Sequence, residues 1–188
     1  MTQKSSMNEL AVKNAICEIG QKLYDKEFVA ANDGNISVKI SSTEIIVTPT
    51  GVSKGGMTPD DLVKITMDGN VIDGSNVPSS EVKMHLEVYR ENPKVNAVVH
   101  AHPPISTAFA CARKPMEQPI LAEAIVMLGI VPVADFALPG TADLPNSIRP
   151  YAKDFNAVLM ANHGLLTWGA DIQEAYFRME SVEHFGKI

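Results

Sequence analysis

The sequence predicts one α+β domain in which a mixed or mainly antiparallel sheet is flanked by helices. The chain has 188 residues, which fits one ordinary domain with a substantial core. Its apolar pattern gives first a helix, then a block of hairpin strands, and then mixed strands and helices. It shows no internal repeat, low-complexity segment or linker that would mark a domain boundary. Residues 1–188 are therefore expected to form a single domain.

The first part of the chain is expected to contain a long helix followed by two hairpins. Residues 8–27 place apolar side chains at helical spacing, and residues 30–35 break the pattern. Asp68-Gly69 is a strong hairpin signal, because both residue types tolerate the backbone of a tight turn. The two hairpins are expected to pair strand 36–40 with strand 44–48, and strand 62–66 with residues 71–72.

The second part is expected to alternate between helices and strands. Pro78-Ser79-Ser80-Glu81 predicts a helix start, with a serine as the cap and Glu81 in the first turn. This helix is expected to run to about Glu91, where Asn92-Pro93 stops it. The elements expected after it are strand 95–102, helices 105–113 and 122–128, strand 129–135, helix 142–155, strands 157–162 and 165–168, and helix 171–185.

The composition excludes some classes of partner. Hydrophobic residues make up 45% and charged residues 20% of the chain, as in ordinary soluble globular proteins. A net charge of -6 without a basic run argues against nucleic acid as a partner. No apolar run approaches the roughly 20 residues that span a bilayer, so no membrane partner is expected. An anionic ligand must then be held by backbone N–H groups, hydroxyls or a metal.

Cysteine usage and the N-terminal residues predict a cytoplasmic protein. Cys17 and Cys111 both lie in apolar helical contexts, where cysteine is usually a small core residue. Two isolated cysteines do not suggest a disulfide framework, so a reducing compartment is expected. The first residues, Met-Thr-Gln-Lys-Ser-Ser, lack the apolar core of a signal peptide.

A metal site is predicted where two apolar strands end in histidine. His100 and His102 are two residues apart on one strand, so their side chains project from the same face. Such a pair can share a divalent metal, with zinc expected, or can simply solvate the strand end. His163 ends another apolar strand, and Gly164 lets the backbone turn tightly behind it. Three histidines at the ends of two adjacent strands favour the metal, with open positions that suit a catalytic zinc.

Small polar turns offer candidate sites for an anion and a base. Ser79 and Ser80, with free N–H groups at a helix start, can bind a phosphate. Glu81 can reach the metal or abstract a proton, although spacing alone equally supports a simple helix cap with a dipole-matching glutamate. Gly34-Asn35 and Thr50-Gly51 can also offer backbone N–H groups, but each by itself is better explained as a plain turn.

Three further titratable residues are expected to play no part in the chemistry. Lys54 follows the Thr50-Gly51 turn closely and can assist there, but a lysine in an exposed loop is usually only solvated. His85 lies on the helix after Glu81, and His184 lies near the C-terminus. Both histidines are expected to be packing or surface residues.

Five motifs occur in the order seen in class II sugar-phosphate aldolases. From about residue 8 to residue 185 the chain resembles the fuculose-1-phosphate aldolase and ribulose-5-phosphate 4-epimerase superfamily, and it is closest in motif to the aldolase branch. Five motifs in the correct order are far more specific than any one alone. The motifs are Gly34-Asn35-Ile36-Ser37, Thr48-Pro49-Thr50-Gly51, Pro78-Ser79-Ser80-Glu81, His100-Ala101-His102 and Asn162-His163-Gly164.

The resemblance implies an α/β/α fold, with a central, mostly antiparallel sheet between helical layers, and a homotetramer with interfacial sites. It implies one zinc ion per subunit, held by His100, His102 and His163, with Glu81 as a movable fourth ligand and acid/base. It also implies a phosphate site formed by Gly34, Asn35, Thr50, Gly51, Ser79 and Ser80. The implied reaction is the reversible cleavage of a ketose 1-phosphate into dihydroxyacetone phosphate and a small aldehyde. Zinc would stabilise the charge of the enediolate, so no Schiff-base lysine is needed.

One departure from the family pattern concerns the aldehyde. In the fuculose enzyme a tyrosine shortly after the His-x-His segment, contributed by a neighbouring subunit, protonates the aldehyde oxygen. The matching stretch here, residues 119–123, contains no tyrosine, and Glu123 occupies the place. Glu123 is therefore the candidate acid on the aldehyde side, and the aldehyde is expected to differ from lactaldehyde.

Three alternative functions stay open within the resemblance. Asn162-His163-Gly164 followed by Thr167-Trp168-Gly169 is similar to the 4-epimerase branch, although those epimerases carry Asp where this chain has Glu81. A methylthioribulose-1-phosphate dehydratase uses a similar zinc site to eliminate water. A non-catalytic binding or scaffold subunit is the third alternative. The complete set of three histidines together with Glu81 argues against it.

Overall fold

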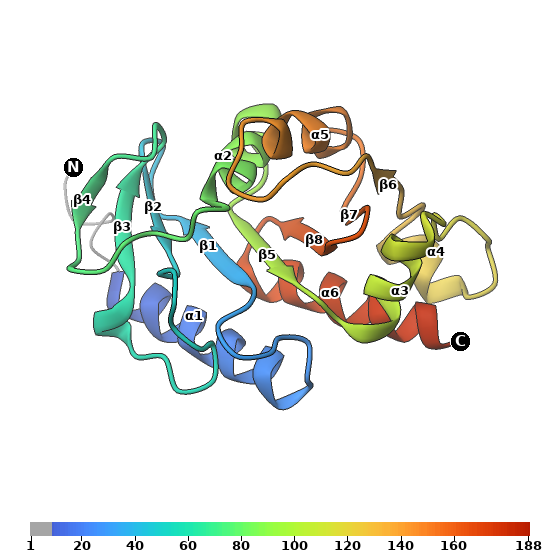
Figure 1. Cartoon of the computed structure of the whole chain (residues 1–188), viewed down its shortest axis with the longest axis horizontal. Helices are drawn as coiled ribbons and strands as arrows, with labels where there is room; N and C mark the ends of the chain where they lie inside the picture. Colours follow the sequence, from blue (N-terminus) through green and yellow to red (C-terminus); the bar gives the residue numbers. More distant parts are fainter. Residues whose placement is uncertain (1–8) are drawn as a thin grey trace.

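An eight-stranded sheet organises the chain in a computed structural model, which describes residues 9–188 (Figure 1). The strands lie in the order β4-β3-β2-β1-β5-β8-β7-β6. Every neighbouring pair is antiparallel except β6 and β7, which are parallel. The predicted mainly antiparallel sheet is therefore confirmed. The strands are β1 Asn35–Lys39, β2 Glu44–Val47, β3 Val63–Thr66, β4 Val71–Asp73, β5 Ala97–Ala101, β6 Val133–Ala134, β7 Ala157–Met160 and β8 Gly164–Gly169.

Helices cover both faces of this sheet. In Figure 1, α1 and α6 lie on one side of the strands, and α2 and α5 lie on the other side. A short 3-10 turn, η1, precedes β3. The helices are α1 Glu9–Asp25, η1 Pro59–Asp61, α2 Val82–Glu91, α3 Pro104–Ala112, α4 Ala122–Met127, α5 Asp143–Ala152 and α6 Ile172–Lys187.

The alternation of side chains along each strand produces two separate apolar cores. On β5, Val99 packs into the core shared with α1 and α6, whereas Val98 packs into the core shared with α2 and α5. Trp168 of β8 pairs with Val98 and is buried in the second core. A sheet with both faces covered in this way has three layers, which confirms the expected α/β/α arrangement.

The start of α2 differs from the sequence prediction. The helix begins at Val82, so Glu81 is the cap residue rather than part of the first turn, and no side chain caps the helix. The Ser79 hydroxyl instead accepts a hydrogen bond from the Glu81 N–H at 3.4 Å. The predicted serine cap is therefore wrong, because residues 79–81 form a turn ahead of the helix. That turn leaves the Glu81 side chain free to face the histidines described below.

Two expectations about single residues are also wrong. Cys111 is exposed, because α3 lies at the edge of the fold and buries only Ser106 and Ala110 among its residues. Lys54 is fully buried rather than solvated. Its main chain packs so closely on α1 that a Cβ at Gly20 would lie 2.9 Å from the Lys54 carbonyl oxygen.

Some elements are shorter than predicted, and one prediction lies outside the described residues. The expected strand 129–135 is reduced to Val133–Ala134, which pairs only with β7 at the edge of the sheet. The helix expected over residues 142–155 ends at Ala152. The N-terminal stretch without the apolar core of a signal peptide lies in residues 1–8, outside the described range. Within residues 9–188, no helix has the length and apolar character needed to cross a bilayer.

A buried polar network joins β1 to α2. The His85 ring nitrogen Nδ1 lies 2.7 Å from the Ser37 hydroxyl, which in turn lies 2.8 Å from the Tyr89 hydroxyl. The Tyr89 hydroxyl also donates to the Ser37 carbonyl oxygen at 3.0 Å. Burial lowers the pKa of His85 to about 3, and the negative charge of Glu81 offsets only part of this effect. His85 is thus a neutral packing residue, as expected.

The stability of the protein is expected to fall on acidification because of His85. Between the unfolded pKa of 6.5 and the folded pKa of about 3, the unfolded chain binds a proton that the folded chain does not. The free energy of unfolding therefore decreases as pH falls through this window, by roughly 3 kcal/mol between pH 7 and pH 4.5. Urea unfolding of metal-free protein and of His85→Gln at both pH values measures the effect. The variant should lose clearly less stability than the wild type; equal losses would contradict the prediction.

Candidate metal centre and anion pocket

Three histidines meet at the ends of strands in the interior of the sheet. His100 is in β5, His102 follows that strand, and His163 lies in the turn between β7 and β8. One nitrogen from each ring lies within 4.8 Å of the other two. Within residues 9–188, no other group of three His, Cys, Asp or Glu side chains is placed to hold a metal ion. The Nε2 atoms of His100 and His102 are 3.1 Å apart. The ring centroid of His163 lies 4.8 Å from that of His100 and 5.3 Å from that of His102.

The strand order explains how His163 reaches the pair. The sequence predicted that the histidines would end two adjacent strands, but β8 lies between β5 and β7. Because β8 returns antiparallel from β7 and pairs Leu165 with Ala101, the β7–β8 turn sits beside the end of β5. Asn162 adopts a left-handed backbone with φ 57, which asparagine tolerates better than most residues. The turn thus places His163 beside His100 and His102.

Gly164 is required by the close approach of the histidine strand. A Cβ at this position would lie 2.5 Å from Cδ2 of His102 and 2.7 Å from the carbonyl oxygen of Ala101. A backbone atom at that distance cannot move aside without shifting β5. Gly164 therefore determines how closely the turn and the paired histidines approach each other.

Replacement of Gly164 by alanine is expected to weaken metal binding. The added methyl group must push His102 or Ala101 away, and overpacking of a tight site costs about 1–3 kcal/mol. Zinc affinity should fall by about 10- to 100-fold, since misplaced ligands act like lost supporting contacts. Competition with a coloured chelator measures this change. Gly129→Ala is the control for general destabilisation, because its left-handed backbone (φ +67) strains an alanine while nothing lies within 4 Å of the added Cβ. Equal zinc affinity in wild type and Gly164→Ala would contradict the prediction.

Glu81 connects the histidines to β1. One carboxylate oxygen lies 3.1 Å from Nε2 of His163, and the other lies 3.5 Å from Nε2 of His100. The Asn35 amide donates to the second oxygen at 2.7 Å. Burial alone would raise the pKa of the Glu81 carboxyl, but hydrogen bonds from the His163 ring and the Asn35 amide, together with attraction to the His100 and His163 rings, outweigh it and hold the pKa well below its ordinary value. The carboxylate is ionised.

The donor set fits a divalent metal. Burial lowers the pKa of both His100 and His102, which favours the neutral imidazoles that metals require. The Nδ1 atom of His100 lies 2.9 Å from the Leu165 carbonyl oxygen, and donation to that oxygen leaves Nε2 with its lone pair free. Three imidazoles beside one carboxylate are donors that fit a zinc ion.

A hollow of about 200 Å³ opens beside the histidines. It is formed by three segments, residues 32–35, 49–50 and 79–81, and it contains no lysine or arginine among its lining residues. An anion in this hollow would therefore be held by amides and hydroxyls. The lining residues are Asn32, Asp33, Gly34, Asn35, Pro49, Thr50, Ser79, Ser80, Glu81, His102 and His163.

This hollow, called the anion pocket below as a candidate site, brings most of the predicted phosphate residues together. Gly34, Asn35, Thr50, Ser79 and Ser80 all line it, whereas Gly51 does not. Gly34 has a left-handed backbone with φ +73, and a Cβ there would lie 2.8 Å from the His100 carbonyl oxygen, so larger residues are excluded. His100 is fully buried and does not line the pocket.

Sequence reasoning missed one polar neighbour of the histidines. Asp33 lies in the turn before β1, and its carboxylate is 3.5 Å from Nδ1 of His102. Such a contact helps to orient a metal-binding imidazole. The only sequence signal is that Asp33 directly precedes Gly34-Asn35, and aspartate is so common in turns that this signal is weak.

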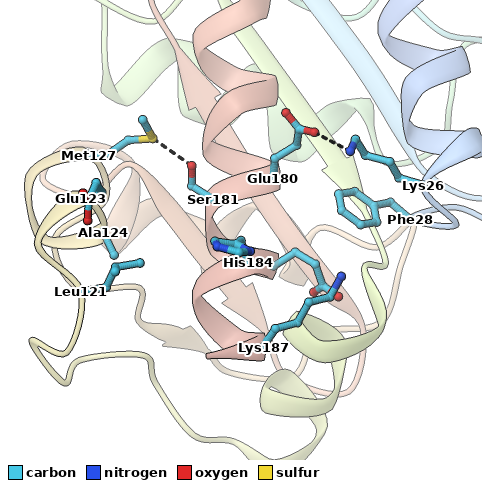
Figure 2. Close-up of a pocket in the computed structure, with 11 residues that line it drawn as sticks. Lys26, Phe28, Leu121, Glu123, Ala124, Met127, Glu180, Ser181, His184 and Lys187 are labelled. Carbon is cyan, nitrogen blue, oxygen red and sulfur yellow. Dashed lines mark hydrogen bonds and ion pairs between the residues drawn. The ribbon is translucent and has the colours of Figure 1, made fainter.

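Glu123 lies apart from this pocket within the chain. It is exposed on α4 and lines a different hollow of about 400 Å³ between α4, α6 and the segment after α1 (Figure 2). Figure 2 shows that Lys26 forms an ion pair with Glu180 across this hollow, with N and O 2.9 Å apart. His184, also on α6, is exposed as expected and lines the same hollow.

Comparisons with known proteins identify a matching family model and several similar chains. A family model described as the Class II Aldolase and Adducin N-terminal domain matches residues 14–188. An L-fuculose phosphate aldolase from Methanococcus maripaludis is 33% identical over 173 residues, which cover 92% of this chain and 91% of that protein. A 3-oxo-tetronate 4-phosphate decarboxylase from Escherichia coli is 32% identical over 184 residues, covering 96% of this chain and 86% of that one. A solved structure of an L-fuculose 1-phosphate aldolase superposes with a TM-score of 0.89 at 32% identity, covering 95% and 84% of the two chains.

Proposed function

Because this chain belongs to the Class II Aldolase and Adducin N-terminal domain family, we propose that it is a zinc-dependent aldolase acting on a ketose 1-phosphate. The products would be dihydroxyacetone phosphate and a small aldehyde, and the reaction would be reversible. The observation that carries this proposal is the position of Glu81. Its carboxylate contacts two of the clustered histidines and also lines the anion pocket.

The three histidines and Glu81 are the residues that would hold the metal. His100, His102 and His163 would be permanent ligands, and Glu81 would be a fourth ligand that substrate displaces. When bound, zinc supplies positive charge that polarises a substrate carbonyl and stabilises the negative charge that develops during bond cleavage. Family membership and the donor set support this role, and zinc is the ion that best matches the donors.

Residues of the chain itself would bind the phosphate and transfer the proton. Asn35, Thr50, Ser79 and Ser80 would hold the phosphate with neutral donors, so the substrate is bound at a fixed distance from the histidines. Glu81 would return a proton to the carbon from which the aldehyde departs, and it would remove that proton in the synthetic direction. The hydrogen bond from Asn35 keeps the carboxylate oriented toward the substrate.

Decarboxylation of a phosphorylated 3-oxo sugar acid is the second candidate. It is favoured by the absence of a tyrosine in residues 119–123, because carbon dioxide leaves without the transfer of a hydroxyl proton that release of an aldehyde requires. A relative with this activity in its name is 32% identical to the chain. Glu81 would then protonate the carbon that carbon dioxide leaves, so the same site serves both reactions.

We also propose that the chain forms a homotetramer with active sites between subunits. The segment 120–138 leaves many apolar side chains in solvent, with Val126 88% exposed, and contact with another copy would cover them. Glu123, in the same segment, would act as the acid on the aldehyde side of a neighbouring copy's site. The other apolar residues exposed there are Ile120, Ile125, Met127, Ile130, Phe136 and Leu138. Sedimentation equilibrium tests the assembly, and a monomer would contradict it.

We propose from the sequence that the protein is located in the cytoplasm. An acidic chain with two isolated cysteines and a sugar-phosphate substrate fits the cytoplasm. Fractionation of cells that express the native gene tests the location. Recovery of the protein outside the cytoplasm would contradict it.

The function is tested with zinc-loaded protein and a panel of substrates. The panel contains ketose 1-phosphates, ketose 5-phosphates and 3-oxo-tetronate 4-phosphate. Release of dihydroxyacetone phosphate together with an aldehyde from a ketose 1-phosphate would support the aldolase. Release of carbon dioxide from 3-oxo-tetronate 4-phosphate would support the decarboxylase instead. A new pentose 5-phosphate with an unbroken chain would indicate an epimerase, and loss of water without cleavage a dehydratase. Either of the last two results would overturn the proposed carbon–carbon lyase, because neither releases two carbon-containing products.

A further inference from the structure

Lys54 is a buried cation directly behind the anion pocket. Its ammonium group donates to the Val52 carbonyl oxygen at 2.6 Å and to the Asn32 carbonyl oxygen at 3.2 Å. The side chain is 0% exposed, so it cannot touch a substrate. Burying a lysine is costly, and such residues persist where their hydrogen bonds hold neighbouring structure in place.

The three walls of the anion pocket are connected in different ways. The 49–50 wall and the 79–81 wall are joined by main-chain hydrogen bonds, from Thr50 N to Val77 O at 2.9 Å and from Ser79 N to Thr48 O at 3.2 Å. The segment 32–34 precedes β1 and lies outside the sheet pairing that begins at Asn35. Lys54 is what joins this segment to the loop that follows Thr50, because its ammonium contacts one carbonyl from each.

We propose that Lys54 is a positioning residue that holds the 32–34 segment and the 50–54 loop at the separation required for a phosphate group. The proposal rests on the proposed function, since it assigns the pocket a phosphate. Asn32, the residue whose carbonyl Lys54 binds, itself lines the pocket. Asp33 comes next and contacts His102, so the same restraint also reaches the histidine side of the site.

The charge and packing of Lys54 agree with this role. Burial lowers its pKa to about 8, and the nearby Asp33 carboxylate offsets part of the shift, so the group still carries its proton at pH 7. A protonated amine has three donors, and the two carbonyls use two of them. Gly20 of α1 lets the Lys54 main chain approach within the space that a Cβ would occupy. Packing on α1 thereby holds the Lys54 main chain in place, so that its side chain can reach the carbonyl oxygens of Asn32 and Val52.

The test compares phosphate binding by zinc-loaded variants in isothermal titration calorimetry, with inorganic phosphate as the probe. Lys54→Met keeps the length of the side chain but removes its donors, and the dissociation constant for phosphate should rise by about tenfold because the loops lose their preorganisation. Lys64→Met is the matched control. The Lys64 side chain is 18% exposed, and its ammonium donates to the Glu9 carboxylate at 2.9 Å. Lys64→Met therefore also removes a charged hydrogen bond, but one that involves no residue of the pocket. It should bind phosphate like the wild type.

The outcomes separate this inference from the proposed function. No phosphate binding by the wild type would overturn the phosphate site and the function based on it. Binding by the wild type that Lys54→Met leaves unchanged, or that both lysine variants weaken equally, would overturn the role of Lys54. With the substrate found in the panel, Lys54→Met should raise KM by about tenfold and leave kcat within about twofold, since the residue acts on binding rather than chemistry.

A second variant covers the possibility that Lys54→Met does not fold. Gly20→Ala adds a methyl group 2.9 Å from the Lys54 carbonyl oxygen and must displace that main chain, without altering any residue of the pocket. Alanine also favours the helix by about 1 kcal/mol over glycine, which offsets part of the strain. Gly20→Ala should weaken phosphate binding in the same assay and retain one zinc per chain. Unchanged phosphate affinity would overturn the inference.

Discussion

Replacement of Glu81 by glutamine is expected to slow turnover by about 100- to 10,000-fold while zinc and phosphate stay bound. Glutamine has the shape of glutamate but cannot accept and return a proton at neutral pH. In the wild type the carboxylate is ionised and lies between His100 and His163, with the Asn35 amide 2.7 Å away. The loss therefore falls on the proton transfer rather than on substrate binding.

Two measurements test the role of Glu81. Steady-state kinetics gives kcat, and hydrogen–deuterium exchange into dihydroxyacetone phosphate reports proton removal without the aldehyde. Both should fall in Glu81→Gln, whereas the dissociation constant for inorganic phosphate should change by less than about threefold, because the phosphate donors are intact. Glu91→Gln is the matched control at the other end of α2, where the side chain is 39% exposed. Normal exchange in Glu81→Gln would remove Glu81 from the proton-transfer step.

Replacement of His100 by alanine is expected to abolish stoichiometric zinc binding. His100 is fully buried, and its ring is held by the hydrogen bond to the Leu165 carbonyl oxygen, so no other side chain can take its place. Loss of an outer-shell partner already lowers metal affinity by about 10- to 100-fold, and loss of a direct ligand should exceed that. Turnover should fall in parallel, because the polarising charge is lost with the metal.

Zinc content measured by native mass spectrometry and by chelator competition tests this expectation. His184→Ala is the matched control, since His184 is exposed on α6 and lies outside the cluster. Thermal unfolding of both variants separates loss of the metal from loss of the fold. His163→Ala is a further variant that disturbs the core less than His100→Ala, because the His163 side chain is 11% exposed. Full zinc occupancy in His100→Ala would show that the metal site lies elsewhere.

Much of the fold could be predicted because its signals are local. The Asp68-Gly69 turn and the alternation in residues 36–40 depend on neighbours a few residues away, and β3–β4 and β1–β2 form as expected. The histidine spacing in β5 likewise requires only the two-residue period of a strand. Errors in this part are confined to ends, such as the start of α2 at Val82, where competing turns have similar energies.

Properties that depend on distant packing could not be predicted in the same way. Lys54 has the sequence context of an exposed loop, and it is buried because α1 presents Gly20 to its main chain. Cys111 has an apolar context, and it is exposed because α3 sits at the edge of the fold. In both cases burial depends on whether an element remote in sequence covers the residue, and local residue patterns carry no information about that.

The sequence by itself determined which chemical groups this protein can use, namely three strand-end histidines, a glutamate after two serines, and glycine-bearing polar turns. The family order of these motifs already indicated a metal and a phosphate. The tertiary structure decided how they meet: β8 inserts between β5 and β7 and thereby brings His163 beside His100. It also decided that Glu123 lies in a separate hollow and that Lys54 lies behind the pocket. Strand order and burial decide these placements, because they depend on pairings between residues far apart in the chain, which no local pattern of residues specifies.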